Sequence, residues 1–259
     1  MKFCANVSIL FKEVPFLERF GRAAAAGFGA VEFWWPAGEA LDEVEAAIRE
    51  AGLAVALFNF DAGEMPAGDR GLLSDPDRAH RFRANVPVAL DLARRIGCER
   101  LNALVGVERA PGERAAQLRL ADENVAWAAD QAAPLGIVLT IEAVNTFENG
   151  PYLLPTTRAS AAFVETVDRP NVRIQWDAYH MQRMEGNLVA TFSEFAPRIA
   201  HVQIADSPGR GEPGTGEINF PFVLDAIDAA GYEGWVGLEY NPTTDTTEES
   251  LAWMPERSA

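Results

Sequence analysis

Eight short apolar segments, separated by helical patterns, constrain the fold of this 259-residue chain more than any other feature. Several of the helical stretches between them end at glycine, as helix C-termini commonly do. Eight strand–helix units in a chain of this length predict an α/β fold, a single (β/α)8 TIM barrel, rather than an open doubly wound sheet. The predicted strands lie at about residues 2–9, 30–35, 53–60, 100–106, 137–144, 172–179, 199–206 and 234–240.

The chain shows no sign of a second domain. No Gly-rich dinucleotide fingerprint follows the first predicted strand, which further weakens the open-sheet alternative. We find no linker, low-complexity tract or shift in composition. We therefore expect one barrel domain over residues 1–259, with a short C-terminal tail from about residue 241.

The composition indicates in which cellular compartment the protein lies and which kinds of partner it binds. A formal charge of −16 argues against nucleic acid, because little basic surface is available to displace phosphate counterions. Cys4 and Cys98 are too few for a disulfide framework, and neither a signal peptide nor a membrane-length apolar stretch is visible. We expect a cytoplasmic protein that acts on a small molecule and binds no membrane; a homo-oligomer is compatible with the sequence.

Four polar residues stand at the ends of the last four predicted strands. They are Glu142 in IVLTIEAV, Asp177 in VRIQWDAY, Gln203 in IAHVQIAD and Glu239 in GWVGLEY. A carboxylate within an apolar run is costly to bury unless a cation or hydrogen bonds compensate its charge. The recurrence of this cost on four strands predicts a shared divalent metal.

Strand periodicity places all four on one face. Side chains alternate along a strand, so residues two apart point the same way. We expect these pairs to face the barrel axis near its C-terminal end, where barrel active sites lie: Thr140 and Glu142, Gln175 and Asp177, His201 and Gln203, Gly237 and Glu239.

The predicted ligands are oxygen donors. Three carboxylates and an amide suit Mg²⁺ or Mn²⁺ better than Zn²⁺. His201 is expected to lie one layer below Gln203, inside the barrel. His180, just past Asp177, either donates to a substrate oxygen or packs at the rim.

Longer segments carry a family resemblance. DAYHMQRMEGNL, HVQIADSPGRGEPGTGEINF, GLEY and AGDRGL resemble the hydroxypyruvate isomerase family of the xylose-isomerase-like barrels. The resemblance implies a metal-assisted isomerase in which Glu142 and Glu239 are the acid/base pair. It also implies one divalent metal ion, bound by Glu142, Asp177, Gln203 and Glu239. Related ketose 3-epimerases usually have His in place of Gln203.

The implied reaction converts hydroxypyruvate into tartronate semialdehyde through an enediolate. One glutamate would remove a proton from the hydroxyl-bearing carbon, and the other would return one to the former carbonyl carbon. Arg210, in the Gly-rich loop after strand seven, either pairs with the substrate carboxylate or is a solvated loop residue. Arg70 is a second candidate for the substrate, and Glu148 matches a substrate-binding acid of the sugar epimerases.

Other functions remain to be weighed. Lys2 and Lys12 are the only lysines, and neither lies inside a late predicted strand, which disfavours a Schiff-base aldolase. The GRGEPGTG segment lacks the lysine of a P-loop and is expected to form a mobile rim loop. A barrel endonuclease would need more than three histidines and a basic surface. The open alternatives are a 2-oxo-tetronate isomerase, a ketose 3-epimerase and a non-catalytic sugar-binding barrel.

Overall fold

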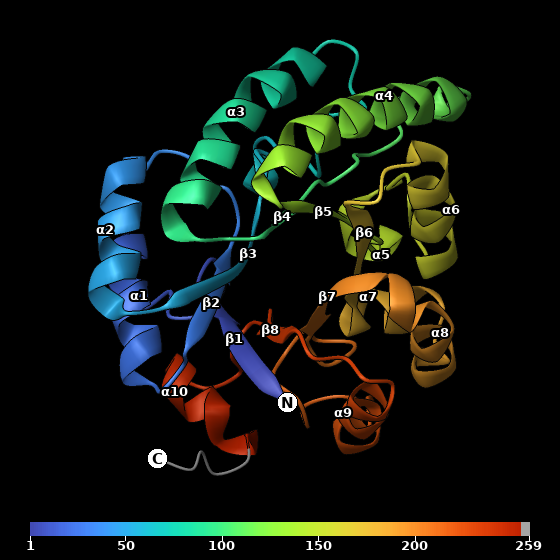
Figure 1. Cartoon of the computed structure of the whole chain (residues 1–259). Coiled ribbons are helices and arrows are strands. Elements are labelled where there is room, and N and C mark those ends of the chain that lie inside the picture. Colours follow the sequence, from blue (N-terminus) through green and yellow to red (C-terminus); the bar gives the residue numbers. More distant parts are fainter. Residues whose placement is uncertain (255–259) are drawn as a thin grey trace.

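Eight parallel strands close into a barrel in the computed structural model, which describes residues 1–254 (Figure 1). The predicted α/β barrel is therefore confirmed, and each predicted strand is present. The last five residues of the predicted tail, 255–259, lie outside the described residues. The strands are β1 (Lys2–Asn6), β2 (Ala30–Phe33), β3 (Ala54–Asn59), β4 (Arg100–Asn102), β5 (Val138–Glu142), β6 (Val172–Asp177), β7 (Ile199–Ile204) and β8 (Trp235–Leu238).

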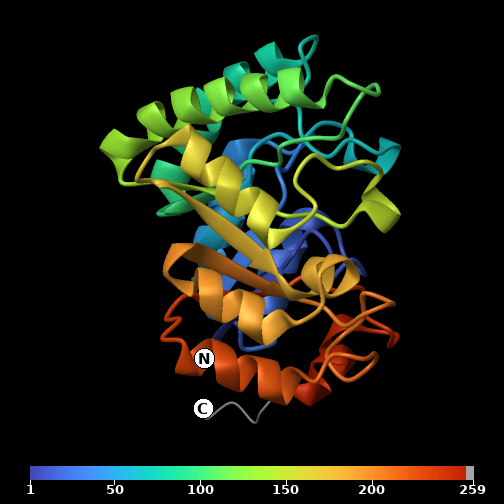
Figure 2. The same ribbon diagram turned by 90° about the vertical axis from the view of Figure 1, so that its right-hand side faces the viewer.

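Helices surround the barrel and cover its outer face (Figures 1 and 2). Gly52, Gly97 and Gly136 end their helices in the left-handed conformation, which explains the glycine at these positions. The helices are α1 (Phe16–Ala25), α2 (Leu41–Ala51), α3 (Ala79–Ile96), α4 (Arg114–Ala132), α5 (Thr146–Asn149), α6 (Thr157–Val167), α7 (Ala178–Met184), α8 (Leu188–Phe195), α9 (Phe220–Ala229) and α10 (Thr247–Ser250).

The alternation of side chains along the strands follows the sequence prediction. Trp176 of β6 points outward and packs on Phe192 of α8, with ring centroids 5.1 Å apart. Its neighbour Gln175 points inward and accepts a hydrogen bond from Thr140 of β5 at 2.9 Å. Gly237 of β8 is also internal, since a Cβ there would collide with the Glu32 carboxylate. The inner and outer faces are thus assigned correctly.

The chain after β8 differs from the seven preceding units. As far as residue 254, it forms only the four-residue helix α10 and a 3-10 turn, Leu251–Trp253. Strand β8 ends at Leu238, so Glu239 directly follows the strand. Within the described chain, no helix combines the length and apolarity needed to cross a membrane.

Candidate active site

A small cavity of about 70 Å³ lies at the C-terminal ends of the strands. Its walls include the predicted residues Glu142, Gln203 and Glu239 from three different strand ends. His180, Arg70 and Arg210 also line it. The structure therefore brings most of the predicted site residues together around one space.

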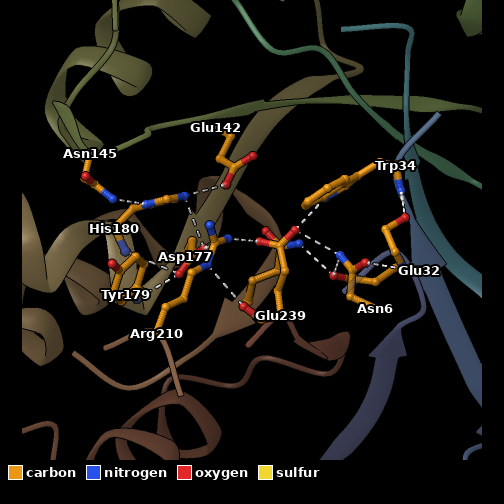
Figure 3. A network of polar contacts seen from close by, with 12 residues as sticks. Asn6, Glu32, Trp34, Glu142, Asn145, Asp177, Tyr179, His180, Arg210 and Glu239 are labelled. Atoms are coloured by element: carbon orange, nitrogen blue, oxygen red, sulfur yellow. Dashed lines mark hydrogen bonds and ion pairs between the residues drawn. The ribbon is translucent and has the colours of Figure 1, made fainter. Parts of the chain in front are cut away.

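Glu142, Asp177 and His180 form a buried cluster whose ligand atoms lie within 4.8 Å of one another. His180 Nε2 is 3.8 Å from Glu142 Oε1 and 3.7 Å from Asp177 Oδ2 (Figure 3). One Asp177 oxygen, Oδ1, caps helix α7 by accepting from the Tyr179 and His180 backbone N–H groups. The other, Oδ2, is buried without a hydrogen-bond partner in the described chain. A buried carboxylate oxygen that accepts no hydrogen bond and lies beside a second carboxylate fits a cation-binding site.

Glu239 lies on the other side of Asp177 and is strongly hydrogen-bonded (Figure 3). Its Oε1 accepts from Asn6 Nδ2 at 3.0 Å and from Trp34 Nε1 at 2.8 Å. Its Oε2 accepts from Arg210 Nη2 at 2.6 Å. These contacts fix the carboxylate, whereas Glu142 accepts a single hydrogen bond among the described residues, from Asn102 Nδ2 at 2.7 Å.

Burial controls the protonation of these groups. The pKa of Glu142 is raised well above its ordinary value by burial and by the nearby charges of Glu239 and Asp177. Burial also raises the pKa of Asp177, and it raises the pKa of Glu239 to about 7 against the opposing effect of Arg210. The pKa of His180 is lowered well below its ordinary value by burial and by two arginines. The metal-free site thus disfavours three ionised carboxylates.

The tautomer of His180 follows from its neighbour Asn145. The Asn145 side-chain oxygen accepts hydrogen bonds from the backbone N–H groups of Phe147 and Glu148. The side-chain atom that faces His180 is therefore the amide nitrogen. That nitrogen lies 2.7 Å from His180 Nδ1, so Nδ1 accepts. Neutral His180 then carries its proton on Nε2, directed at the two carboxylates. From this position it could donate to a substrate oxygen, and that role stays a prediction.

Gln203 is held inside the barrel by two partners. Its Nε2 donates to Glu32 Oε1 at 2.6 Å, and its Oε1 accepts from Gln175 Nε2 at 2.6 Å. Gln203 lines the cavity. Ligation of a metal would require its Oε1 to give up or share the bond from Gln175. Its role as a ligand stays a prediction.

The sequence analysis missed the carboxylate beneath this site. Glu32 of β2 is fully buried, and His201 Nε2 lies 2.5 Å from its Oε2. Asn6 Nδ2 donates to it at 3.0 Å and to Glu239 as well, linking Glu32 to the site. The available signal was a glutamate within the apolar segment AVEF, on an inward-facing position. His201 is interior, as expected.

Arg210 and its loop differ from the sequence expectation. Arg210 contacts Glu239, lies 4.0 Å from Asp177 Oδ2 and stacks over the Tyr179 ring, so it is not a solvated loop residue. Asp206 accepts four backbone N–H bonds from residues 207–218 of this loop. The loop is thus tied down by internal bonds, contrary to the expectation of a mobile rim.

The remaining predicted residues lie at the rim. Arg70 lines the cavity from the loop after β3. Glu148 is exposed and accepts a hydrogen bond from the Tyr179 hydroxyl, which places it outside the cavity wall. No contact tests its predicted role with substrate.

Known proteins resemble the chain over nearly its whole length. It is 42% identical to hydroxypyruvate isomerase of Escherichia coli, over 98% of both chains. It is 38% identical to 2-oxo-tetronate isomerase of Cupriavidus necator, over 98% of this chain and 97% of that one. A crystal structure from Brucella melitensis, described as AP endonuclease, family 2, superposes with a TM-score of 0.94 at 40% identity and covers 99% of both chains.

The family model described as xylose isomerase-like TIM barrel matches residues 20–257. This match covers most of the barrel, including every carboxylate of the cavity. The chain belongs to the xylose isomerase-like TIM barrel family.

Proposed function

We propose that this protein is a hydroxypyruvate isomerase that interconverts hydroxypyruvate and tartronate semialdehyde. The observation that carries the proposal is the pair Glu142 and Glu239, two buried glutamates that line one small cavity. Relatives at 42% and 38% identity are named as isomerases of small hydroxy-oxo acids, which supports the same reaction type here.

A divalent cation, Mg²⁺ or Mn²⁺, belongs to this proposal. Glu142, Asp177 and Glu239 would hold it through carboxylate oxygens, with Gln203 as the fourth ligand. The unpartnered Asp177 Oδ2 supports a cation at this place, and oxygen donors suit these two metals. When bound, the cation would stabilise negative charge on the substrate oxygens as a Lewis acid.

The protein's own residues would move the protons. One glutamate takes a proton from C3 of hydroxypyruvate, and the other delivers a proton to C2, which forms the new C2–H bond. The O3 hydroxyl gives up its proton and O2 gains one, so C3 becomes the aldehyde and C2 carries the hydroxyl. The Nε2–H of His180 donates to a substrate oxygen. Asn6, Trp34 and Arg210 keep Glu239 in one orientation, so its carboxylate is positioned before substrate arrives.

The alternative substrates are larger or neutral. A 2-oxo-tetronate is one carbon longer and is supported by the Cupriavidus necator relative. A ketose 3-epimerase usually has His where this chain has Gln203, so Gln203 at the cavity wall disfavours that alternative. A non-catalytic sugar-binding barrel would not need two glutamates at the cavity. The endonuclease name of the Brucella melitensis protein fits poorly, because this chain has three histidines and a charge of −16.

An activity panel with metal-reconstituted protein tests the proposal. Hydroxypyruvate, 2-oxo-tetronates and free ketoses are offered to protein loaded with Mg²⁺ or Mn²⁺ after chelation. We expect the highest kcat/KM with hydroxypyruvate and none in metal-free protein. Faster turnover of neutral ketoses would favour an epimerase, and no turnover of any substrate would favour a binding protein. The cytoplasmic location and a homo-oligomeric state stay predictions.

A further inference from the structure

Two arginines line the cavity, and their charges are compensated very differently. The Arg210 guanidinium contacts the Glu239 carboxylate at 2.6 Å and approaches Asp177 Oδ2 at 4.0 Å. Within residues 1–254, no carboxylate lies within 4.0 Å of the Arg70 guanidinium. Arg70 is therefore a cation of the cavity wall that forms no ion pair with these residues.

Arg70 is held by neutral groups alone. Its Nη1 donates to the backbone oxygens of Met65 at 2.9 Å and Asp69 at 2.6 Å, and its Nε donates to Asn149 Oδ1. These bonds use Nε and Nη1 as donors. None of the hydrogen bonds among the described residues uses Nη2, whose two N–H groups remain for a ligand.

The backbone around Arg70 is fixed as well. Gly71 has a φ of +115°, and a Cβ at this position would collide with the backbone oxygen of Leu104, another residue of the cavity wall. The Gly71 N–H donates to the Ala62 oxygen at 3.0 Å. The Asp69 carboxylate is gripped by both terminal nitrogens of Arg78. Arg70 is thus preorganised, so binding an anion would require little ordering of the chain.

Electrostatics around Arg70 favour an anion. The pKa of Arg70 is lowered by burial and by the positive charge of Arg210, against a smaller opposing effect of Asp69. An anionic ligand between the two arginines would offset their mutual repulsion. In the metal-loaded site, a divalent cation and Arg210 together balance the three negative charges of Glu142, Asp177 and Glu239. The charge of Arg70 then remains for the substrate.

We propose that Arg70, rather than Arg210, binds the carboxylate of the substrate and selects small hydroxy-oxo acids over neutral hydroxy ketones. This inference rests on the proposed function and deepens it. Arg210 instead positions Glu239. From the sequence, Arg210 is the first candidate to bind the substrate carboxylate and Arg70 the second. The ion pair between Arg210 and Glu239 argues against that ranking.

Hydroxypyruvate and dihydroxyacetone provide a matched test, since they differ by a carboxylate in place of a hydroxymethyl group. We measure kcat/KM for both with Mn²⁺-loaded wild type, Arg70→Ala, Arg70→Lys and Arg210→Ala. Arg70→Ala should lower kcat/KM for hydroxypyruvate about 10- to 100-fold, mainly through KM, and leave the value for dihydroxyacetone unchanged. Arg70→Lys should recover part of the loss. Arg210→Ala should lower kcat for both substrates.

Arg78→Ala is the control for loosening of the loop, because Arg78 holds Asp69 but does not line the cavity. It should not change the ratio of the two kcat/KM values. If Arg70→Ala lowers kcat/KM equally for both substrates, the role of Arg70 is structural and the proposal is wrong. If only Arg210→Ala lowers kcat/KM selectively for hydroxypyruvate, Arg210 and not Arg70 binds the substrate carboxylate.

A binding measurement separates this inference from the proposed reaction. Pyruvate and its neutral amide are compared by ligand-detected NMR on the Mn²⁺-free, Mg²⁺-loaded wild type and Arg70→Ala protein. Pyruvate binding that depends on Arg70 supports the anion site even if hydroxypyruvate is not turned over, in which case only the proposed function fails. Equal binding of pyruvate to both proteins would overturn the inference whatever the activity.

Discussion

Replacing Glu32 by Ala should destabilise the barrel more than any surface change, although Glu32 has no predicted contact with substrate. Its carboxylate is the acceptor for Asn6 Nδ2 and Gln203 Nε2, and it contacts His201 Nε2. Each buried donor left without a partner costs roughly 1–3 kcal/mol. Part of this is offset because a buried charge is removed, so we expect a net loss of about 4 kcal/mol, within the range for breaking a buried pair.

Calorimetry measures this loss. For a chain of this size, about 4 kcal/mol corresponds to a drop in Tm of roughly 8–16 °C. Glu32→Gln keeps the volume and one acceptor oxygen and should fall between Glu32→Ala and wild type. Glu50→Ala on the exposed face of α2 is the control and should change stability by less than about 0.5 kcal/mol. If Tm falls by less than 3 °C in Glu32→Ala, measured at the same scan rate as the wild type, Glu32 does not organise the barrel interior.

Three further predictions concern the carboxylates of the cavity. Glu142→Gln and Glu239→Gln should each lower kcat at least about a hundredfold, because the amide cannot act as a base. In D2O, solvent deuterium should enter the product of the wild-type enzyme. Complete retention of the substrate hydrogen would indicate a hydride shift instead. Asp177→Ala should lose Mn²⁺ affinity in calorimetric titrations while its circular dichroism stays that of the wild type; unchanged affinity would remove Asp177 from the ligands. In metal-free protein, the raised pKa of Glu239, about 7 against 4.5, adds stability below pH 4.5 that is lost as pH rises through 7. The loss amounts to about 3 kcal/mol, so the Tm of the wild type should fall from pH 5 to pH 8 and recover with Mg²⁺ at pH 8. The fall should be smaller in Glu239→Gln. An equal change of Tm with pH in both proteins would assign the pH effect to other groups.

Side-chain alternation explains why much of the site could be predicted. In β5 to β7, apolar residues on the outer face fix the parity of the strand, so Glu142, Asp177 and Gln203 could only point inward. Glu239 follows β8 and was still placed correctly, because Gly237 fixes the same inward position two residues earlier. The same rule applied to β1 and β2 would have found Asn6 and Glu32.

The partners of the arginines could not be predicted in this way, because loops have no period. Arg210 has a φ of +55° and contacts Glu239 from a loop whose backbone N–H groups donate to Asp206. Arg70 is oriented by Asn149, 79 residues away in the sequence. Strand parity therefore located the carboxylates, while the pairing of charges, which decides where a substrate carboxylate can bind, emerges only from the folded loops. The substrate preference of this barrel should accordingly change through its loops more readily than its acid/base pair does, since the glutamates are fixed by the strands and Arg70 is not.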